Sequence, residues 1–299
     1  EDMVECHHFV FGYGSLLCCH SRSQSFQTTT TSTITNENND DVTASEPRVV
    51  LPVNVKGMER VWSKRTTMMT AMGVRFQVGS STTGVLISVS PTEIQQLDLR
   101  EQGYDRLEIH GSDIEQVSFL KDSSVYDGWD WMFESEDTVD HKKRKRTVDM
   151  KRLRVWVYMP QKFSPPSKEY PIVQSYVDTI LRGCLDVGGE DFARDFIVTT
   201  IGWHPEQFHD TCHDGGGGIY RREDDTNKLT TKSSTNSHSS VVNAATWVDD
   251  RCHPIYSRCD VIHMEKNADM FDQLLYKYHP DYFSTRKSLF KKRRDGKVG

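Results

Sequence analysis

The 299-residue sequence has little of three features that would point to particular classes of protein. It has no apolar run near the ~20 residues that a membrane-spanning helix needs. Its formal net charge is only −6, so its charge gives no reason to expect a nucleic acid or an acidic membrane as partner. It also has no internal repeat, which argues against a solenoid or a propeller. We therefore expect no nucleic-acid partner and no membrane partner.

The cysteine pattern provides no disulfide framework. The sequence has 7 cysteines, an odd number, and no Cys-x-x-Cys pair. Such a pattern fits a reducing compartment, and we expect a cytoplasmic protein. The chain begins at Glu1 rather than Met, so a targeting peptide before it would not be visible here.

A group of possible metal ligands occurs late in the chain. It consists of His204, His209, Cys212 and His213. Their spacing does not match a standard zinc motif, and the segment runs into a glycine tract. We expect a loop without metal, and no other cofactor.

Polar tracts interrupt the chain. Hydrophobic residues make up only 36% of it, which indicates an ordinary core diluted by solvated insertions. We expect one domain over 1–299, with low-complexity insertions at about 21–47, 112–148 and 210–246 and an aperiodic C-terminal extension at 247–299. The basic run 142–146 follows acidic residues, and a solvated charged insertion is expected there rather than a nucleic-acid site.

The remaining segments carry clear secondary-structure patterns. Apolar, β-branched stretches predict strands at 8–11, 48–62, 83–89, 105–110 and 153–159. Ser90, Pro91 and Glu93 predict a helix with a capping box that stops at Gly103. A second helix is expected from Pro171 to the glycine pair at 188–189, paired with a third over 190–201. The order predicts an α+β fold: a mixed β-barrel or sheet with a few packed helices and long disordered insertions.

The first candidate site is the loop after the first strand. It consists of Gly12, Tyr13, Gly14, Ser15 and Leu16. Its glycines can take positive φ and let a ligand approach the backbone, where successive N–H groups suit a carboxylate or phosphate. No Gly-Lys-Ser/Thr follows, and the third glycine of a dinucleotide loop is missing. Taken alone, an ordinary tight turn remains the more common explanation.

The second candidate is the carboxylate of Glu101. Ile94, Leu97 and Glu101 are spaced to share one helix face, which must also meet the core. A glutamate in that position is either paired with a cation or partly desolvated beside a cavity. Desolvation raises the pKa of a carboxyl group and suits it to general acid–base catalysis near neutral pH.

Two simpler explanations compete with a catalytic Glu101. Spacing alone favours a salt bridge from Glu101 to Arg100, Arg106 or another basic residue. Asp98 could be the functional carboxylate instead, although it sits one turn earlier and is expected to bond Arg106 or a nearby backbone group.

The two candidates together resemble a known family. Tyr13-Gly14-Ser15-Leu16 and the later Leu97-Asp98-Leu99-Arg100-Glu101-Gln102-Gly103-Tyr104 are similar, in order and context, to two motifs of the γ-glutamyl cyclotransferase superfamily, including its ChaC and AIG2-like branches. The segments 57–62 and 176–189 resemble a strand and a helix of the same proteins. The resemblance covers the ordered parts of 8–110 and 153–202.

The resemblance implies an enzyme and a reaction. A γ-glutamyl peptide or amine, with glutathione as first candidate, would cyclise to 5-oxoproline and release an amine or Cys-Gly, as in a carbon–nitrogen lyase or acyltransferase. Glu101 would be the general acid and base, and the loop residues 12–16 with Tyr104 would bind the substrate. The small-molecule substrate is then the expected partner. The alternative is a non-catalytic member that binds a γ-glutamyl group or carboxylate and acts through partners.

Overall fold

The computed structural model describes residues 7–26, 48–120, 124–127, 132–135, 146–148, 153–204 and 246–289. Several sequence predictions fall outside these ranges: the possible metal ligands His209, Cys212 and His213, the basic residues 142–145, and the polar tracts 27–47 and 210–245.

The described elements follow one another along the chain as strands, short helices and two long helices. They are β1 (His7–Gly12), η1 (Ser15–Leu17), α1 (Cys19–Ser25), β2 (Val50–Arg65), β3 (Thr70–Val89), α2 (Pro91–Arg100), β4 (Tyr104–Ile109), η2 (Gly111–Asp113), β5 (Ile114–Gln116), η3 (Ser118–Leu120), η4 (Ser124–Tyr126), β6 (Phe133–Ser135), β7 (Arg146–Val148), β8 (Leu153–Pro160), β9 (Ile172–Val173), α3 (Gln174–Thr199), β10 (Trp247–Asp249), α4 (Val261–Tyr278), α5 (Pro280–Phe283) and β11 (Lys287–Ser288).

The main sheet confirms the expected α+β class. Its order is β4-β8-β1-β3-β2-β5-β7-β6. β1 and β8 run parallel, and the other neighbours are antiparallel. The five predicted strands are all present, and β3 begins earlier than expected, at Thr70, because it forms a long hairpin with β2. β1 lies inside the sheet, and its apolar residues Phe9, Val10 and Phe11 are buried in the core.

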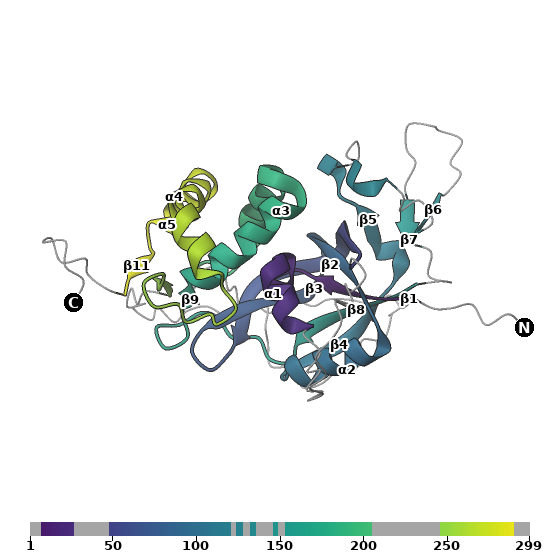
Figure 1. The fold of residues 1–299 in the computed structure, drawn as a ribbon, viewed down its shortest axis with the longest axis horizontal. Helices are drawn as coiled ribbons and strands as arrows, with labels where there is room; N and C mark the ends of the chain where they lie inside the picture. Colours follow the sequence, from purple (N-terminus) through teal and green to yellow (C-terminus); the bar gives the residue numbers. More distant parts are fainter. Residues whose placement is uncertain are drawn as a thin grey trace, which may run out of the picture.

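Two long helices pack together beside this sheet. Figure 1 shows α3 in green and α4 in yellow-green next to each other, with α2 away from both. The expected helix pair at 171–201 is present, and only its start is wrong. The helix begins at Gln174, because Ile172 and Val173 pair with β10 as a strand. As expected, non-helical backbone at Gly188 and Gly189 divides α3 into two helical parts. The chain turns back there, since the Trp62 ring contacts both Tyr176 near the start of α3 and Trp203 just after its end.

The expectation of an aperiodic extension at 247–299 is also wrong for the described part. Met264, Phe271, Leu274 and Leu275 form a buried stripe on α4. Polar residues between them hide the helical period in the sequence. β10 joins a second, parallel three-stranded sheet with β9 and β11, so this segment belongs to the folded core.

Two of the expected insertions contain regular structure. The tract at 21–47 begins inside α1, whose Ser21 is buried, and Phe26 is buried directly after it. The stretch at 112–148 contributes β5, β7 and β6 to the edge of the main sheet, with Ile114 and Met132 buried. Short apolar segments dispersed among polar residues therefore add to the sheet where the composition predicted only solvated chain.

Candidate functional site

A cleft of about 460 Å³ brings both sequence motifs together. Six parts of the chain line it: the end of β1 with the loop after it, the β2–β3 hairpin, the end of α2 with the turn into β4, Tyr158 on β8, Tyr176 on α3, and the segment 255–258. All the residues that the sequence nominated are among the lining residues: Gly12, Tyr13, Gly14, Ser15, Leu16, Glu101 and Tyr104.

The glycine loop keeps its shape through close contact with buried side chains. Leu17 N–H donates to the Gly14 carbonyl at 2.9 Å and closes a turn of 3₁₀-helix. The N–H groups at the start of that turn have no partner within the helix, as at any helix start. Gly14 has a φ of −131°, so positive φ is not the reason for glycine here. A Cβ would lie 3.1 Å from the Tyr176 hydroxyl and 3.2 Å from Met72 Cβ, so a larger residue would have to displace these side chains by a few tenths of an ångström.

Two tyrosines that line the cleft donate hydrogen bonds from their hydroxyls to backbone carbonyls. Tyr13 donates to the Tyr158 carbonyl, and Tyr104 donates to the Met72 carbonyl at 3.0 Å. Burial raises the pKa of both Tyr13 and Tyr104 well above the ordinary range, and the charge of Glu101 adds to each rise. The two phenols therefore stay protonated and remain hydrogen-bond donors at neutral pH.

The position of Glu101 follows from how α2 ends. Ser90 and Glu93 form the predicted capping box at the start of the helix, and the helix ends at Arg100, earlier than the expected stop at Gly103. Glu101 is the C-cap residue, and its N–H donates to the Leu97 carbonyl at 2.8 Å. Gly103, with a φ of 78°, completes the turn into β4.

The Glu101 side chain forms the salt bridge that its spacing favoured. Its Oε1 lies 3.1 Å from Arg100 Nε, and the side chain is 18% exposed. Within the described part of the chain, no hydrogen bond is made by its second oxygen, Oε2. One carboxylate oxygen is thus oriented by a cation while the other is available to the cleft.

Asp98 has a different environment. The Tyr158 hydroxyl donates to Asp98 Oδ1 at 2.8 Å, and Arg106 Nε lies 3.3 Å from the same oxygen. Asp98 does not line the cleft. Its expected bond to Arg106 is confirmed, and its role is to hold β4 and β8 against α2.

The charge of the cleft is mostly positive. Lys64, Arg65, Arg100 and Arg258 line it, and Glu101 is the one carboxylate among the described lining residues. Burial lowers the pKa of Lys64, which donates to the Gly103 carbonyl at 2.8 Å. This electrostatic balance suits a small molecule that carries at least one carboxylate.

Sequence reasoning missed several lining residues. Tyr158 and Tyr176 read as core residues of a strand and a helix, and nothing local shows that they face a cleft. Tyr256 and Arg258 lie in the segment expected to be aperiodic. No pattern in the sequence around these residues indicates that they reach the cleft.

The described residues include no group of three or more His, Cys, Asp or Glu side chains arranged to hold a metal ion. His204, the one described member of the possible metal ligands, stacks on Tyr282 with ring centroids 6.3 Å apart. No helix in the described ranges is both long and apolar enough to cross a membrane.

The comparisons with known proteins found structural likeness only. No protein-family profile matches the sequence, and no curated protein matches it. A solved γ-glutamyl cyclotransferase is similar at 11% identity and a TM-score of 0.39, over 72% of this chain and 94% of that one. An uncharacterized protein from Homo sapiens gives 12% and 0.38, over 64% and 87%. A yeast γ-glutamyl cyclotransferase specific to glutathione gives 14% and 0.32, over 64% and 84%.

Likeness of this degree leaves the reaction and the substrate to the residues of the cleft.

Proposed function

We propose that the protein is a γ-glutamyl cyclotransferase. The observation that supports this most is the convergence of the glycine loop and Glu101, which lie far apart in the sequence, on one cleft. The loop offers backbone N–H groups, and Glu101 offers a carboxylate oxygen. These are the two kinds of group that a γ-glutamyl unit needs, because it carries an α-carboxylate and an α-amine.

The proposed reaction is an intramolecular acyl transfer. Glu101 takes a proton from the α-ammonium group, whose pKa near ~8 keeps it mostly charged at neutral pH. The freed amine nitrogen attacks its own γ-carbonyl carbon and forms the lactam ring. The bond from that carbon to the leaving nitrogen breaks, and Glu101 returns the proton to this nitrogen. The products are 5-oxoproline and a free amine, and no water or cofactor is consumed.

The loop has a separate role in this proposal. Its N–H groups hold the α-carboxylate, as backbone nests do for other anions. Fixing the carboxylate sets the direction of the amine relative to the γ-carbonyl. Orientation of this kind lowers the barrier to ring closure because the reacting atoms start close together.

A substrate panel tests the proposal. The purified protein would be incubated separately with glutathione, γ-glutamyl dipeptides and γ-glutamyl amines, and 5-oxoproline would be measured by mass spectrometry. We expect release from at least one class, with an equal amount of the free amine. Absence of 5-oxoproline across the panel would reject the proposal.

A second candidate is a non-catalytic carboxylate-binding protein. The ion pair between Arg100 and Glu101 favours it, because the Glu101 carboxylate then has a structural partner that involves no proton transfer. Calorimetric binding of γ-glutamyl compounds without any turnover would support this candidate over the enzyme.

The glycine loop gives a further prediction. Gly14→Ala places a methyl group against Tyr176 and Met72 and should displace the loop. We therefore expect KM to rise by about tenfold, which corresponds roughly to the binding free energy of one hydrogen bond to a charged group. Gly57→Ala is the control, because Gly57 has a φ of 70° but lies outside the cleft. It should cost about 1 kcal/mol of stability and leave KM unchanged. Equal KM values for the two variants would contradict a loop that binds substrate.

A further inference from the structure

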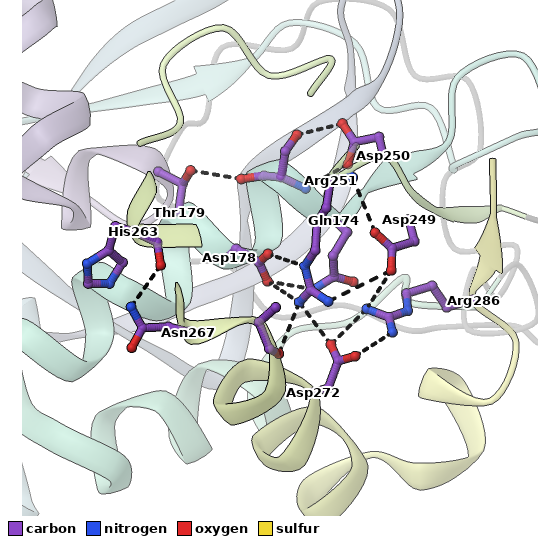
Figure 2. Close-up of polar contacts among 12 residues, drawn as sticks. Gln174, Asp178, Thr179, Asp249, Asp250, Arg251, His263, Asn267, Asp272 and Arg286 are labelled. Atoms are coloured by element: carbon purple, nitrogen blue, oxygen red, sulfur yellow. Dashed lines mark hydrogen bonds and ion pairs between the residues drawn. The ribbon is translucent and has the colours of Figure 1, made fainter. Parts of the chain in front are cut away.

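The segment from Asp250 to Arg258 folds back over the cleft and is firmly anchored there. Asp250 is fully buried and accepts hydrogen bonds from Ser175 N–H at 2.8 Å and Ser175 Oγ at 2.6 Å, both on α3. It also accepts from Ile255 N–H at 2.7 Å. Figure 2 shows Asp250 beside Arg251, whose guanidinium faces the opposite way, into a set of carboxylates. One buried carboxylate thus joins the start of this segment to α3 and to the backbone of Ile255 in its middle.

The tip of the segment is held as well. Tyr256 N–H donates to Ser175 Oγ at 3.2 Å, and its hydroxyl lies 2.9 Å from Ser21 Oγ on α1. Its ring packs edge-on against Tyr176, with centroids 4.7 Å apart. Tyr256 is buried, and the backbone on either side of it is therefore fixed.

This anchoring places Arg258 in the wall of the cleft. Arg258 is half-buried and lies two residues after the fixed Tyr256. The other cations of the cleft each have at least one partner. Lys64 donates to the Gly103 carbonyl, and Arg65 lies over the Tyr170 ring at 5.1 Å. Arg100 pairs with the Glu101 carboxylate through Nε and has one buried guanidinium nitrogen, Nη1, without a hydrogen bond.

Arg258 differs from them. In the described part of the chain, its guanidinium has no hydrogen bond, ion pair or ring contact. A guanidinium held at the wall of a cleft, with its donors free, is suited to bidentate recognition of a carboxylate.

We propose that Arg258 selects the leaving group of the substrate by binding a carboxylate on the amino acid or peptide that is released. This inference rests on the proposed function. The α-carboxylate is assigned to the glycine loop and the α-amine to Glu101, so a cation on a separate part of the wall is available for a second carboxylate. Asp250 is the positioning residue that holds the loop carrying Arg258. A released amine without a carboxylate makes no use of this guanidinium.

Two matched substrate pairs test the inference. γ-Glutamylglycine and γ-glutamylethylamide differ by exchange of a carboxylate for a methyl group in the leaving amine. Glutathione and its glycyl ethyl ester differ by masking of the same charge farther along the leaving group. Values of kcat/KM would be measured for the four compounds with wild type, Arg258→Met and Arg258→Lys.

The wild type should prefer the acidic member of at least one pair. Arg258→Met should reduce kcat/KM for that member about tenfold to a hundredfold, as loss of a hydrogen bond to a charged group does, and leave the uncharged member nearly unchanged. Arg258→Lys should recover part of the preference, because it restores the charge without the planar fork. An unchanged preference in both pairs would overturn the inference.

Two controls make the result specific to this residue. Arg65→Met removes another cation of the cleft wall, and Arg194→Met removes an exposed one on α3 outside the cleft. If Arg65→Met abolishes the preference and Arg258→Met does not, the assignment to Arg258 is wrong.

Failure of the proposed function would look different. In that case the wild type releases 5-oxoproline from none of the four compounds, and calorimetric Kd values take the place of kcat/KM. The same Arg258-dependent difference in affinity within a pair supports the carboxylate site, and equal affinities reject it.

Discussion

Replacing Glu101 by glutamine is expected to lower kcat by about 10²–10⁴-fold, the usual contribution of a general acid or base. Glutamine keeps the size of the side chain, but its amide cannot take a proton from the α-ammonium group at neutral pH. Binding of the γ-glutamyl substrate should be nearly unchanged, because the loop amides remain. The measurements are 5-oxoproline release for kcat and calorimetry for Kd.

Asp98→Asn is the matched comparison for this variant. Asp98 lies one turn earlier on α2, outside the cleft, and is bonded to Tyr158 and Arg106. Its replacement should reduce stability modestly and leave kcat close to that of the wild type. The opposite pattern, with turnover lost in Asp98→Asn and kept in Glu101→Gln, would remove Glu101 from the mechanism.

Replacing Arg251 by methionine is expected to destabilise the fold by about 3–5 kcal/mol, the cost of leaving a buried carboxylate without its partner. Arg251 donates to Asp178 at 2.6 and 2.9 Å and lies 2.8 Å from Asp272 (Figure 2). Asp178 is 1% exposed, so water cannot replace the lost hydrogen bonds. Chemical unfolding in urea would measure the loss. Lys277→Met, which breaks an exposed pair with Glu190, should change the stability little.

The loss in Arg251→Met should also depend on pH. Burial raises the pKa of Asp178 from 3.8 to about 6, and Arg251 opposes the rise. Because the folded pKa exceeds the unfolded one, this group's contribution to stability is lost as the pH rises from about 4 through 6. Without Arg251 the folded pKa rises further, and the decline continues above pH 6. The variant should therefore differ from wild type more at about pH 8 than at about pH 5, and a difference independent of pH would contradict this account.

Local signals in the sequence predicted the elements that carry the site. Ser90, Pro91 and Glu93 specify the start of α2 through contacts within one turn, so the capping box could be read from the sequence. The apolar run of β1 and the glycines after it could be predicted from the sequence in the same way. The α+β class followed from the order of such elements.

Long-range contacts account for what could not be predicted. The Tyr13 hydroxyl reaches a carbonyl 145 residues away, and Asp250 bonds a serine 75 residues earlier. No pattern within a window of sequence indicates such pairs. For the same reason the wall formed by Tyr256 and Arg258 was missed, since it depends on how α4 and its preceding loop pack against α3.

The helix α4 shows a second reason why part of the fold could not be predicted from the sequence. Its buried residues Met264, Phe271 and Leu275 have helical spacing, but charged and amide residues between them dilute the pattern. The apolar stripe of α2 is weak too, but its capping residues still allowed the helix to be predicted. The Asp260 cap of α4 accepts from His263 N–H at 3.1 Å, but no glutamate stands three residues later, so the sequence there does not have the pattern of a capping box.

We propose above all that the cleft closes a γ-glutamyl group into a ring. The most direct measurement follows a ¹³C-labelled γ-glutamyl peptide by NMR in the presence of the wild-type protein. The account predicts that the label passes into the lactam carbonyl of 5-oxoproline, matched by an equal amount of released amine. Label appearing in free glutamate would show hydrolysis by water, and label remaining in the peptide would show no reaction; either result would contradict the account.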